Sequence, residues 1–392
     1  MFGCWNRTAD DEGADKYHND VIDHIKKKES PNFGIILGDN IYSNKSDGEK
    51  FHDVEGLEKG LEKLSILKKP LYATLGNHDV TQCDILTHEL KSEHWRMQTN
   101  YYYEKIEIND HIIHLLVIDT NLLNNDYDYN LPCVCEHIIR ERNYRSVGDI
   151  NKLLIDDNDK KKAISELLIN EMFTKLGEEV QNINNDMANN DKKNIAIIAG
   201  HEPLFSVKRK IKEKDKKKKG DKGDEGDKEN KGDDKKKEGD KEKIILKINC
   251  LQRIDKVVDL INSIKCNKYY VCADVHMYQY GIVKYGDIEI HQIVAGTGGA
   301  EPDMIPETDF YERAQSDGNK IQYTILEKGN PYGYVICNIN DGMLYHKFIT
   351  VNNCHKIDGH PQCINDKRQN VGDQNLKHKY LKYKSKYLKL KI

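Results

Sequence analysis

Apolar residues recur along the first part of the chain at spacings that alternate between helix and strand. Residues 17–28 and 57–67 have apolar side chains three or four positions apart, the spacing of one face of a helix. Residues 33–37 and 71–75 are short, continuously apolar runs, as in strands that are buried on both faces. This succession of helices and strands predicts an α/β domain with a largely buried sheet.

The rest of the chain continues the pattern and becomes richer in strands. Residues 101–108 and 111–118 flank the turn pair Asn109-Asp110 and therefore predict a hairpin. Helices are expected over residues 160–180 and 251–264. Further strands are expected over residues 194–199, 268–272, 278–285, 288–294, 323–326, 333–339 and 343–351. Two sheets packed face to face, with helices outside, would accommodate these elements.

Residues 208–243 interrupt the pattern with a stretch of Lys, Asp, Glu and Gly that holds one Ile and no aromatic residue. Counting gives 17 basic and 12 acidic side chains, a local net charge of +5. So little apolar surface cannot offset the entropy lost on ordering, and we expect a disordered insertion over residues 207–243. Its basic first part, residues 208–219, can contact an anionic partner, although such charge runs are more often only solvated.

The end of the chain differs again. Residues 375–392 hold seven lysines and no acid, and their apolar side chains follow helical spacing. We expect a basic amphipathic tail helix that binds a partner helix or an anionic surface, or covers the domain's own surface. Residues 352–374 are predicted to be a linker. Residues 1–206 and 244–351 are then expected to form one domain around the insertion.

Composition narrows the class of protein. The charged fraction of 32% is high and the hydrophobic fraction of 38% is low for a globular chain, as expected of a folded core with solvated segments. A net charge of −4 excludes a uniformly basic nucleic-acid-binding protein. No apolar run has the length of a membrane span, and the start lacks a secretory signal pattern. Ten scattered cysteines favour free thiols, so an intracellular, cytoplasmic location is expected.

Four short stretches share one layout, an apolar strand followed by a turn with metal-binding side chains. Glycine precedes the polar residue in three of them, where it lets the backbone turn sharply. In α/β folds ligands gather at the carboxyl ends of strands, so these turns can meet in one crevice. The four turns are GDNIY at residues 38–42, GNHD at 76–79, GHEP at 200–203 and ADVH at 273–276.

The chemistry of these turns suits metal ions. Each turn alone is weak evidence, because Gly-Asp or Gly-His after a strand is usually an ordinary turn. Together they supply carboxylate, amide, imidazole and phenol groups, a set suited to two divalent or trivalent ions rather than to a structural thiolate zinc site. A single carboxylate, Asp39, can bridge two ions about 3.5–4 Å apart, the spacing of sites that clamp a phosphoryl group.

With these four motifs in this order, the chain resembles the calcineurin-like metallophosphoesterases, and within them the purple acid phosphatase-like branch. The resemblance covers residues 1 to about 350 outside the lysine-rich insertion, and it implies a four-layer α/β/β/α sandwich. It also implies two metal ions, iron paired with iron, zinc or manganese. The motif residues then take these roles: Asp39 bridges the ions, Tyr42 and His276 bind the first, and Asn77 and His201 bind the second. His78 is expected beside the phosphate, where it helps to protonate the leaving oxygen or steadies the transition-state charge.

Two positions depart from the family pattern. The family has an aspartate in its first motif where this chain has Cys4, so a softer thiolate would complete the first metal site. The strand expected before this motif is missing, since Met1 is only three residues away. Asp274 stands where the family has the first histidine of a Gly-His-x-His motif, and we expect this carboxylate to bind the second ion.

The resemblance predicts a hydrolase of the acid phosphatase type, with His78, Asp39 and Asn77 as catalytic residues, in which a metal-bound hydroxide attacks a phosphomonoester. The substrate would be a small molecule or a phosphoprotein. An alternative is a catalytically impaired scaffold that binds nucleic acid or a protein through its insertion and tail, and a third hypothesis is a phosphodiesterase. The tail and the lysine-rich and asparagine-rich composition also resemble proteins of large DNA viruses, which suggests an infected cell or a virion as the setting.

Overall fold

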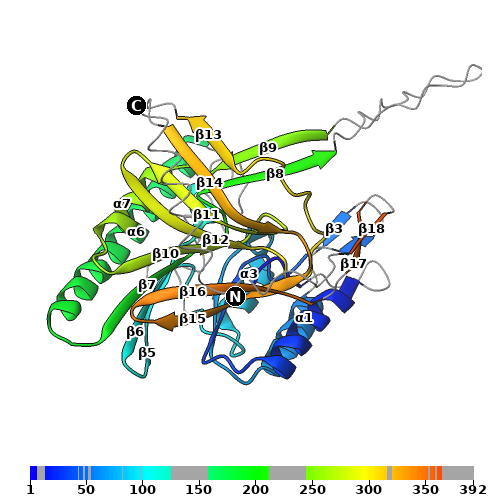
Figure 1. The fold of residues 1–392 in the computed structure, drawn as a ribbon, viewed down its shortest axis with the longest axis horizontal. Coiled ribbons are helices and arrows are strands. Elements are labelled where there is room, and N and C mark those ends of the chain that lie inside the picture. The colour runs from blue at the N-terminus through cyan, green and yellow to red at the C-terminus, as the bar shows by residue number, and fades with distance from the viewer. Residues whose placement is uncertain are drawn as a thin grey trace, which may run out of the picture.

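The computed structural model describes residues 1–6, 14–42, 44–46, 49–51, 54–81, 83–97, 99–124, 158–211, 244–315, 320–351, 354–357 and 360–363. Its largest element is a mixed sheet of eight strands in the order β13-β14-β11-β12-β10-β7-β6-β5 (Figure 1). The central strands β6, β7, β10 and β12 run parallel to one another, and the outer pairs are antiparallel. These strands are β5 (Tyr102–Ile108), β6 (His111–Val117), β7 (Lys193–Ala199), β10 (Asn267–Cys272), β11 (Tyr278–Tyr285), β12 (Ile288–Ala295), β13 (Phe310–Ala314) and β14 (Lys320–Gly329).

A second group of strands surrounds the start of the chain. Strand β1 (Gly34–Leu37) pairs in parallel with β4 (Leu71–Thr74), and β15 (Gly333–Asn340) pairs antiparallel with β16 (Met343–Thr350). Residues 1–2 connect the two pairs: Phe2 bridges to Ile36 on one side, and the Val335 amide donates to the Met1 carbonyl on the other. The result is a second sheet in the order β16, β15, residues 1–2, β1, β4.

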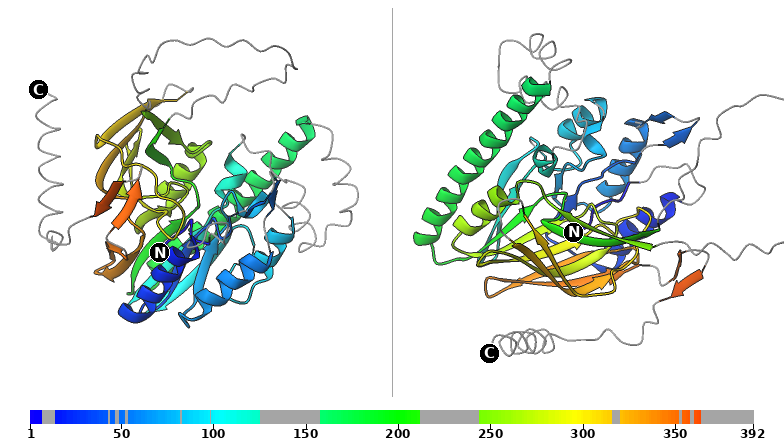
Figure 2. Two further views of the ribbon diagram at one scale, coloured as in Figure 1. Left: turned by 90° about the vertical axis from the view of Figure 1, so that its right-hand side faces the viewer. Right: turned by 90° about the horizontal axis from the view of Figure 1, so that it is seen from above.

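Helices lie in two groups on the outside. Helices α1 (Ala14–Lys28), α2 (Val54–Ser65) and α3 (Cys83–Lys91) form one group, and α6 (Asn158–Ala188) packs with α7 (Ile254–Ser263) in the other. Figure 1 shows α6 and α7 together at one side of the molecule and α1 at the other, and Figure 2 turns the molecule to show both groups. One continuous hydrophobic core includes residues from both sheets and both helix groups. The expected α/β architecture with two sheets and outer helices is confirmed.

Most predicted elements lie within a few residues of their expected bounds, and the strand-rich second half follows the predicted order. The helix predicted over residues 160–180 is longer and ends at Ala188. Strand β13 and the short hairpin of β2 (Asn44–Ser46) and β3 (Glu49–Phe51) were not predicted. None of the helices in the described ranges combines the length and apolar character of a membrane-spanning segment.

The predicted start of the lysine-rich insertion is wrong. Strand β8 (Phe205–Ile211) continues through residues 207–211 and pairs with β9 (Ile244–Cys250) as an antiparallel hairpin. The strand is possible despite its charges because Val207 is fully buried and the Lys208 ammonium lies 2.9 Å from the carboxylate of Asp303. Residues 212–243 lie outside the described residues.

The predicted linker over residues 352–374 also needs correction. Strands β17 (Cys354–Ile357) and β18 (His360–Cys363) pair antiparallel within it. The remaining residues from 364 onward, including the predicted tail helix over 375–392, lie outside the described part of the chain.

Candidate metal centre

The candidate metal ligands follow the carboxyl ends of strands in both sheets. Because parallel strands end at the same edge, turns that are far apart in sequence meet there. Cys4 follows residues 1–2, Asp39 follows β1, Asn77 follows β4, His201 follows β7, and Asp274 and His276 follow β10. The first three turns belong to the second sheet and the last two to the eight-stranded sheet, so the centre lies between the two sheets.

The backbone of these turns is unusually tight. Asp39 has a φ of 51° and follows Gly38, whose φ is 78°. A side chain on Gly76 would place its Cβ only 2.1 Å from the Asp39 nitrogen, so glycine alone fits there. Cys4 and Asp274 also have left-handed backbone, each with a φ of 53°. Non-glycine residues rarely adopt this conformation, and such strained positions concentrate at functional sites.

Asp39 is buried, and its two carboxylate oxygens face different sets of side chains. Oδ1 lies 3.2 Å from Nε2 of His201, which in turn lies 3.1 Å from Oδ1 of Asn77. Oδ2 accepts a hydrogen bond of 2.9 Å from the hydroxyl of Tyr42, which lies 3.2 Å from Nε2 of His276. One carboxylate therefore connects two separate groups of potential ligands.

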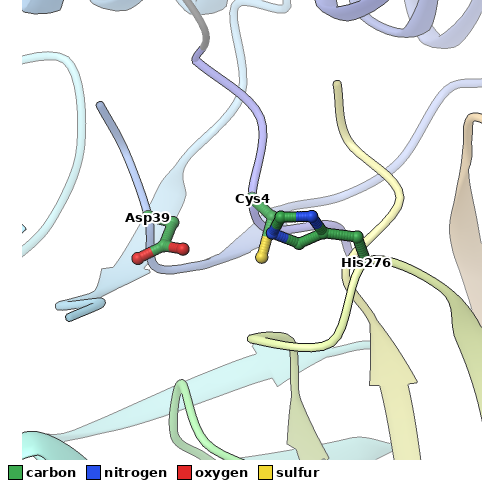
Figure 3. Close-up of side chains that lie close together, drawn as sticks. All are labelled: Cys4, Asp39 and His276. Carbon is green, nitrogen blue, oxygen red and sulfur yellow. The ribbon is translucent and has the colours of Figure 1, made fainter. Parts of the chain in front are cut away.

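Cys4, Tyr42 and His276 form the first of these groups together with Asp39, and we call it the Cys4 group. The sulfur of Cys4, a carboxylate oxygen of Asp39 and a ring nitrogen of His276 all lie within 4.8 Å of one another. Figure 3 shows how these three side chains gather from three separate segments. The sequence predicted this convergence, including the unusual cysteine.

Asn77 and His201 form the second group on the other oxygen of Asp39, and we call it the Asn77 group. Asp274, which we predicted to bind the second ion, makes no hydrogen bond or ion pair with the members of this group in the described structure. Its carboxylate lies close enough to raise the pKa of His201, and it lines a neighbouring cavity with Glu202 and Lys208. Asn77, His201 and the shared Asp39 are thus three convergent potential ligands, and the carboxylate of Asp274 lies nearby.

Both histidines are oriented by backbone carbonyl groups. Nδ1 of His201 lies 2.8 Å from the Leu37 carbonyl oxygen, and Nδ1 of His276 lies 2.8 Å from the Glu301 carbonyl oxygen. These contacts place a proton on Nδ1 and turn Nε2 of each ring toward Asp39 and its neighbours. Histidines that bind metal ions are usually oriented in this way by a hydrogen bond to the other ring nitrogen.

Burial and charge set the protonation of the centre. Burial raises the pKa of Asp39, but attraction to His201 and His78 outweighs it and leaves the pKa below its ordinary value. Burial lowers the pKa of His201, but the charges of Asp39 and Asp274 reverse the shift and raise it. Burial, with repulsion from Asp39, raises the pKa of Cys4 and Tyr42 well above their ordinary values. The thiol and the phenol therefore keep their protons at neutral pH.

His78 lies at the edge of the centre and is half-buried. Its backbone amide donates a 3.1 Å hydrogen bond to Oδ1 of Asp39. Its ring packs against Tyr42, with ring centroids 4.5 Å apart. His78 therefore contacts Asp39 and Tyr42, and its role beside a phosphate stays a prediction.

Behind the ligand turns lies a buried polar network that sequence reasoning assigned no role. Asp79 accepts hydrogen bonds from the amides of Asn40 and Gly76 at 2.7 and 2.6 Å. The side chain of Asn40 donates to Asp79 at 2.9 Å and to Glu89 at 3.4 Å. Burial, with repulsion from Asp39, raises the pKa of Asp79 to about 7, and burial also raises that of Glu89. The network fixes the two turns that carry Asp39 and Asn77.

The contact between Lys208 and Asp303 is a second feature that the sequence did not predict. The same Oδ2 atom of Asp303 accepts from the Lys208 ammonium at 2.9 Å and from the backbone amide of His276 at 3.0 Å. Lys208 is only 8% exposed. Because Lys208 begins a lysine-rich stretch, its burial was not predicted. The apolar Val207 beside it was the one sequence signal for a strand here.

The donor atoms fit metal ions. Ligand atoms bound to one ion at about 2.0–2.3 Å lie roughly 3–4 Å from one another. In the Asn77 group, Nε2 of His201 lies 3.2 Å from the Asp39 oxygen and 3.1 Å from the Asn77 oxygen, which matches this spacing. In the Cys4 group, the Tyr42 hydroxyl lies 2.9 Å from the Asp39 oxygen and 3.2 Å from Nε2 of His276, which also matches it. Oxygen and nitrogen ligands dominate both groups, and Cys4 adds one soft ligand to the first.

Comparison with known proteins agrees with this fold. None of the curated proteins matches the chain. A solved structure described as "GAP50 the anchor in the inner membrane complex of Plasmodium" aligns with a TM-score of 0.50 and 12% identity, over 96% of this chain and 91% of that chain. At this identity the likeness shows the fold alone. The family model for calcineurin-like phosphoesterases matches residues 3–231, more than half of the chain. The chain belongs to the calcineurin-like metallophosphoesterase family.

Proposed function

We propose that the protein is a metal-dependent hydrolase of phosphomonoesters, of the purple acid phosphatase type. The observation that carries the proposal is the position of Asp39, whose two oxygens each face a separate group of ligands. A carboxylate placed in this way suits two ions that share it. Family membership supports hydrolysis of a phosphoester, and Tyr42 beside Asp39 and His276 supports the purple branch.

Each side chain has a defined task in this proposal. Cys4, Tyr42 and His276 would hold one ion, and Asn77 and His201 the other, with Asp39 shared and Asp274 completing the second set. Two ions held there supply positive charge for the phosphoryl oxygens and acidify water. The Nδ1 contacts of His201 and His276 hold both rings in place before substrate arrives, so little reorganisation is needed during the reaction.

His78 is the proposed proton donor for the leaving oxygen. Its ring is half-buried at the edge of the centre, within reach of a substrate bound between the two groups. Packing against Tyr42 limits the rotation of the ring, and the hydrogen bond from its amide ties the turn to Asp39. General acid catalysis of this kind contributes roughly 10²–10⁴-fold to a rate.

A second candidate function is a scaffold with impaired catalysis. The separation of Asp274 from Asn77 and His201 favours it, because a second ion would then have fewer protein ligands. In that case the insertion and the tail would bind nucleic acid or a protein partner, and turnover would be dispensable.

Metal content and turnover together test these candidates. We expect two ions per chain by mass spectrometry and a visible absorption band from iron bound to Tyr42. Hydrolysis of 4-nitrophenyl phosphate should exceed that of its bis(4-nitrophenyl) diester. Tyr42→Phe should lose the band, and Asp39→Asn should lower turnover by roughly a hundredfold or more.

The exposed Asp110 gives a matched control for Asp39, and Asp110→Asn should keep both metals and turnover. Two ions with no turnover on any phosphoester would favour the scaffold. Faster hydrolysis of the diester would contradict the choice of substrate class.

A further inference from the structure

A polar cavity of about 490 Å³ opens beside the Asn77 group. Small-molecule sites commonly have volumes of about 300–1,000 Å³. Glu202 and Asp274 line the end of the cavity that is nearest the metal centre. Glu202 directly follows His201, and the charge of Asp39 contributes to its pKa shift. Lys208, which also lines the cavity, shares the carboxylate of Asp303 with the backbone amide of His276. The cavity therefore adjoins the turns that carry His201 and His276.

One face of the β8–β9 hairpin forms the opposite wall. Ser206 and Lys208 alternate along β8, and their partners Asn249 and Lys247 lie directly across on β9. Residues paired in this way point to the same side of a sheet. All four line the cavity, so its wall is polar and includes two lysines that are paired across the hairpin.

These cations are incompletely neutralised. Lys208 pairs with Asp303, but Lys247 makes no hydrogen bond or ion pair within the described residues. Arg313, which also lines the cavity, donates to the Ile248 carbonyl at 3.4 Å and forms no ion pair with a described carboxylate. Like charges directly opposite one another destabilise a strand pair. Arg313 contacts the residue that follows Lys247, so an anion in the cavity could be bound by both of these cations.

We propose that this cavity, at its Lys247 and Arg313 end, binds a second anionic group on the alcohol part of the substrate. The inference rests on the proposed function and names the class of substrate: a phosphomonoester that also carries a carboxylate or a further phosphate. Glu202 and Asp274 belong to the turns that carry the metal ligands, whereas Lys247 and Arg313 lie on strands β9 and β13, outside those turns. A substrate with one anionic group at each end matches this arrangement.

Binding of two phosphonates, which cannot be hydrolysed, tests the inference. Benzylphosphonate and 4-carboxybenzylphosphonate differ only in the second anionic group, and their affinities for the manganese-loaded protein can be measured by calorimetry at low salt. We expect the carboxylated compound to bind roughly tenfold more tightly, as for a charge-assisted hydrogen bond. The double variant Lys247→Gln, Arg313→Gln should lose this difference and bind benzylphosphonate as the unchanged protein does.

Arg209→Gln is the matched control. Arg209 is adjacent to Lys208 on the same strand, but its side chain points to the other face, where it pairs with Glu307 at 3.1 Å. This variant should keep the tenfold preference. The inference would be overturned if the unchanged protein bound the two phosphonates equally, or if the double variant kept the preference. Either result would leave the proposed function intact. Failure of both phosphonates to bind would overturn the two together.

Discussion

At the scale of single residues, the centre is built from side chains on strained backbone. Cys4, Asp39 and Asp274 have left-handed φ angles of 53°, 51° and 53°. Asparagine and aspartate adopt this conformation more readily than other non-glycine residues, so cysteine is the unusual member of the three. Cys4 is held by its own amide, which donates to the Gly38 carbonyl at 2.9 Å, and by its carbonyl, which accepts from Ala300 at 2.9 Å.

Replacing Cys4 should change metal preference rather than remove metal binding. In Cys4→Asp a hard carboxylate takes the place of a soft thiol on a backbone that aspartate tolerates well. We expect the retained ratio of manganese to zinc to rise several-fold after loading from an equimolar mixture, because thiolates select zinc and carboxylates suit manganese. Mass spectrometry of the metals measures this ratio. An unchanged ratio would show that the Cys4 sulfur is not a ligand.

His346 allows a prediction about stability and pH that does not depend on the centre. Burial lowers its pKa to about 4, with a further contribution from His291, and its Nε2 atom is buried without a hydrogen-bond partner among the described residues. Between pH 6.5 and 4 the unfolded chain therefore binds a proton that the folded chain does not, so this histidine lowers stability as the pH falls.

His346→Phe should remove that loss. Near pH 7 the variant and the unchanged protein should have similar stability, whereas at pH 4 the variant should be more stable by about 1–3 kcal/mol. Urea unfolding at both pH values measures the difference. A gain of the same size at pH 7 and pH 4 would mean that packing, not protonation, is responsible.

At the scale of elements, each ligand turn follows a buried strand, and this relation made the centre predictable. The apolar runs predicted strands β1, β4, β7 and β10. The polar residues just after these strands were the predicted metal ligands. Family resemblance then assigned roles that spacing alone could not assign. The distance of Asp274 from the Asn77 group was beyond prediction, because it depends on the turn geometry after β10.

Strand β8 escaped prediction for a different reason. Its buried Lys208 and its half-buried Arg209 are both cations, so its composition matches that of the charged insertion that follows it. The tertiary contact between Lys208 and Asp303, 95 positions apart in sequence, offsets the cost of burying that lysine. Such a contact leaves no local signal. The same is true of the network around Asn40, where the partner Glu89 comes from a separate helix.

Two glycines allow a paired test of how tightly the elements pack. Gly76→Ala would force a Cβ to within 2.1 Å of the Asp39 nitrogen and 2.4 Å of its carboxylate, so we expect loss of metal binding and a destabilised fold. Gly177 lies within α6, where an added Cβ would meet no described atom within 4 Å. Gly177→Ala should stabilise the protein by about 0.5–1 kcal/mol, since alanine favours helix. Thermal unfolding and metal content should distinguish the two variants. Equal changes in both variants would contradict the close contact at Gly76 and the open space at Gly177.

At the scale of the whole molecule, the centre connects two sheets. Cys4, Asp39 and Asn77 come from one sheet, and His201 and His276 from the other. An ion bound by both sets links the sheets across their interface. Metal binding is therefore expected to stabilise the entire fold and not only the turns that hold it.

Manganese at about a hundred times its dissociation constant should raise the free energy of unfolding by about 2.7 kcal/mol. In His201→Ala the increase should be reduced or absent, because the second ion would then lose a ligand from the eight-stranded sheet. His88→Ala alters an exposed histidine that pairs with Glu58 and should keep the full increase. Thermal unfolding with and without manganese measures the effect, and an undiminished shift in His201→Ala would exclude a role for that ring.

The order of the strands also determines when the centre can form during synthesis. The first proposed ligand is Cys4, and the last, His276, follows β10, so the ligands span residues 4 to 276 of the chain. The strands between them pair out of sequence order, with β7 between β6 and β10. Parallel pairings between distant segments form slowly, after the loops between them have closed. Most of the polypeptide must leave the ribosome before Asp39 meets both of its ligand groups. Metal capture is thus a late event that completes folding and cannot guide its first steps.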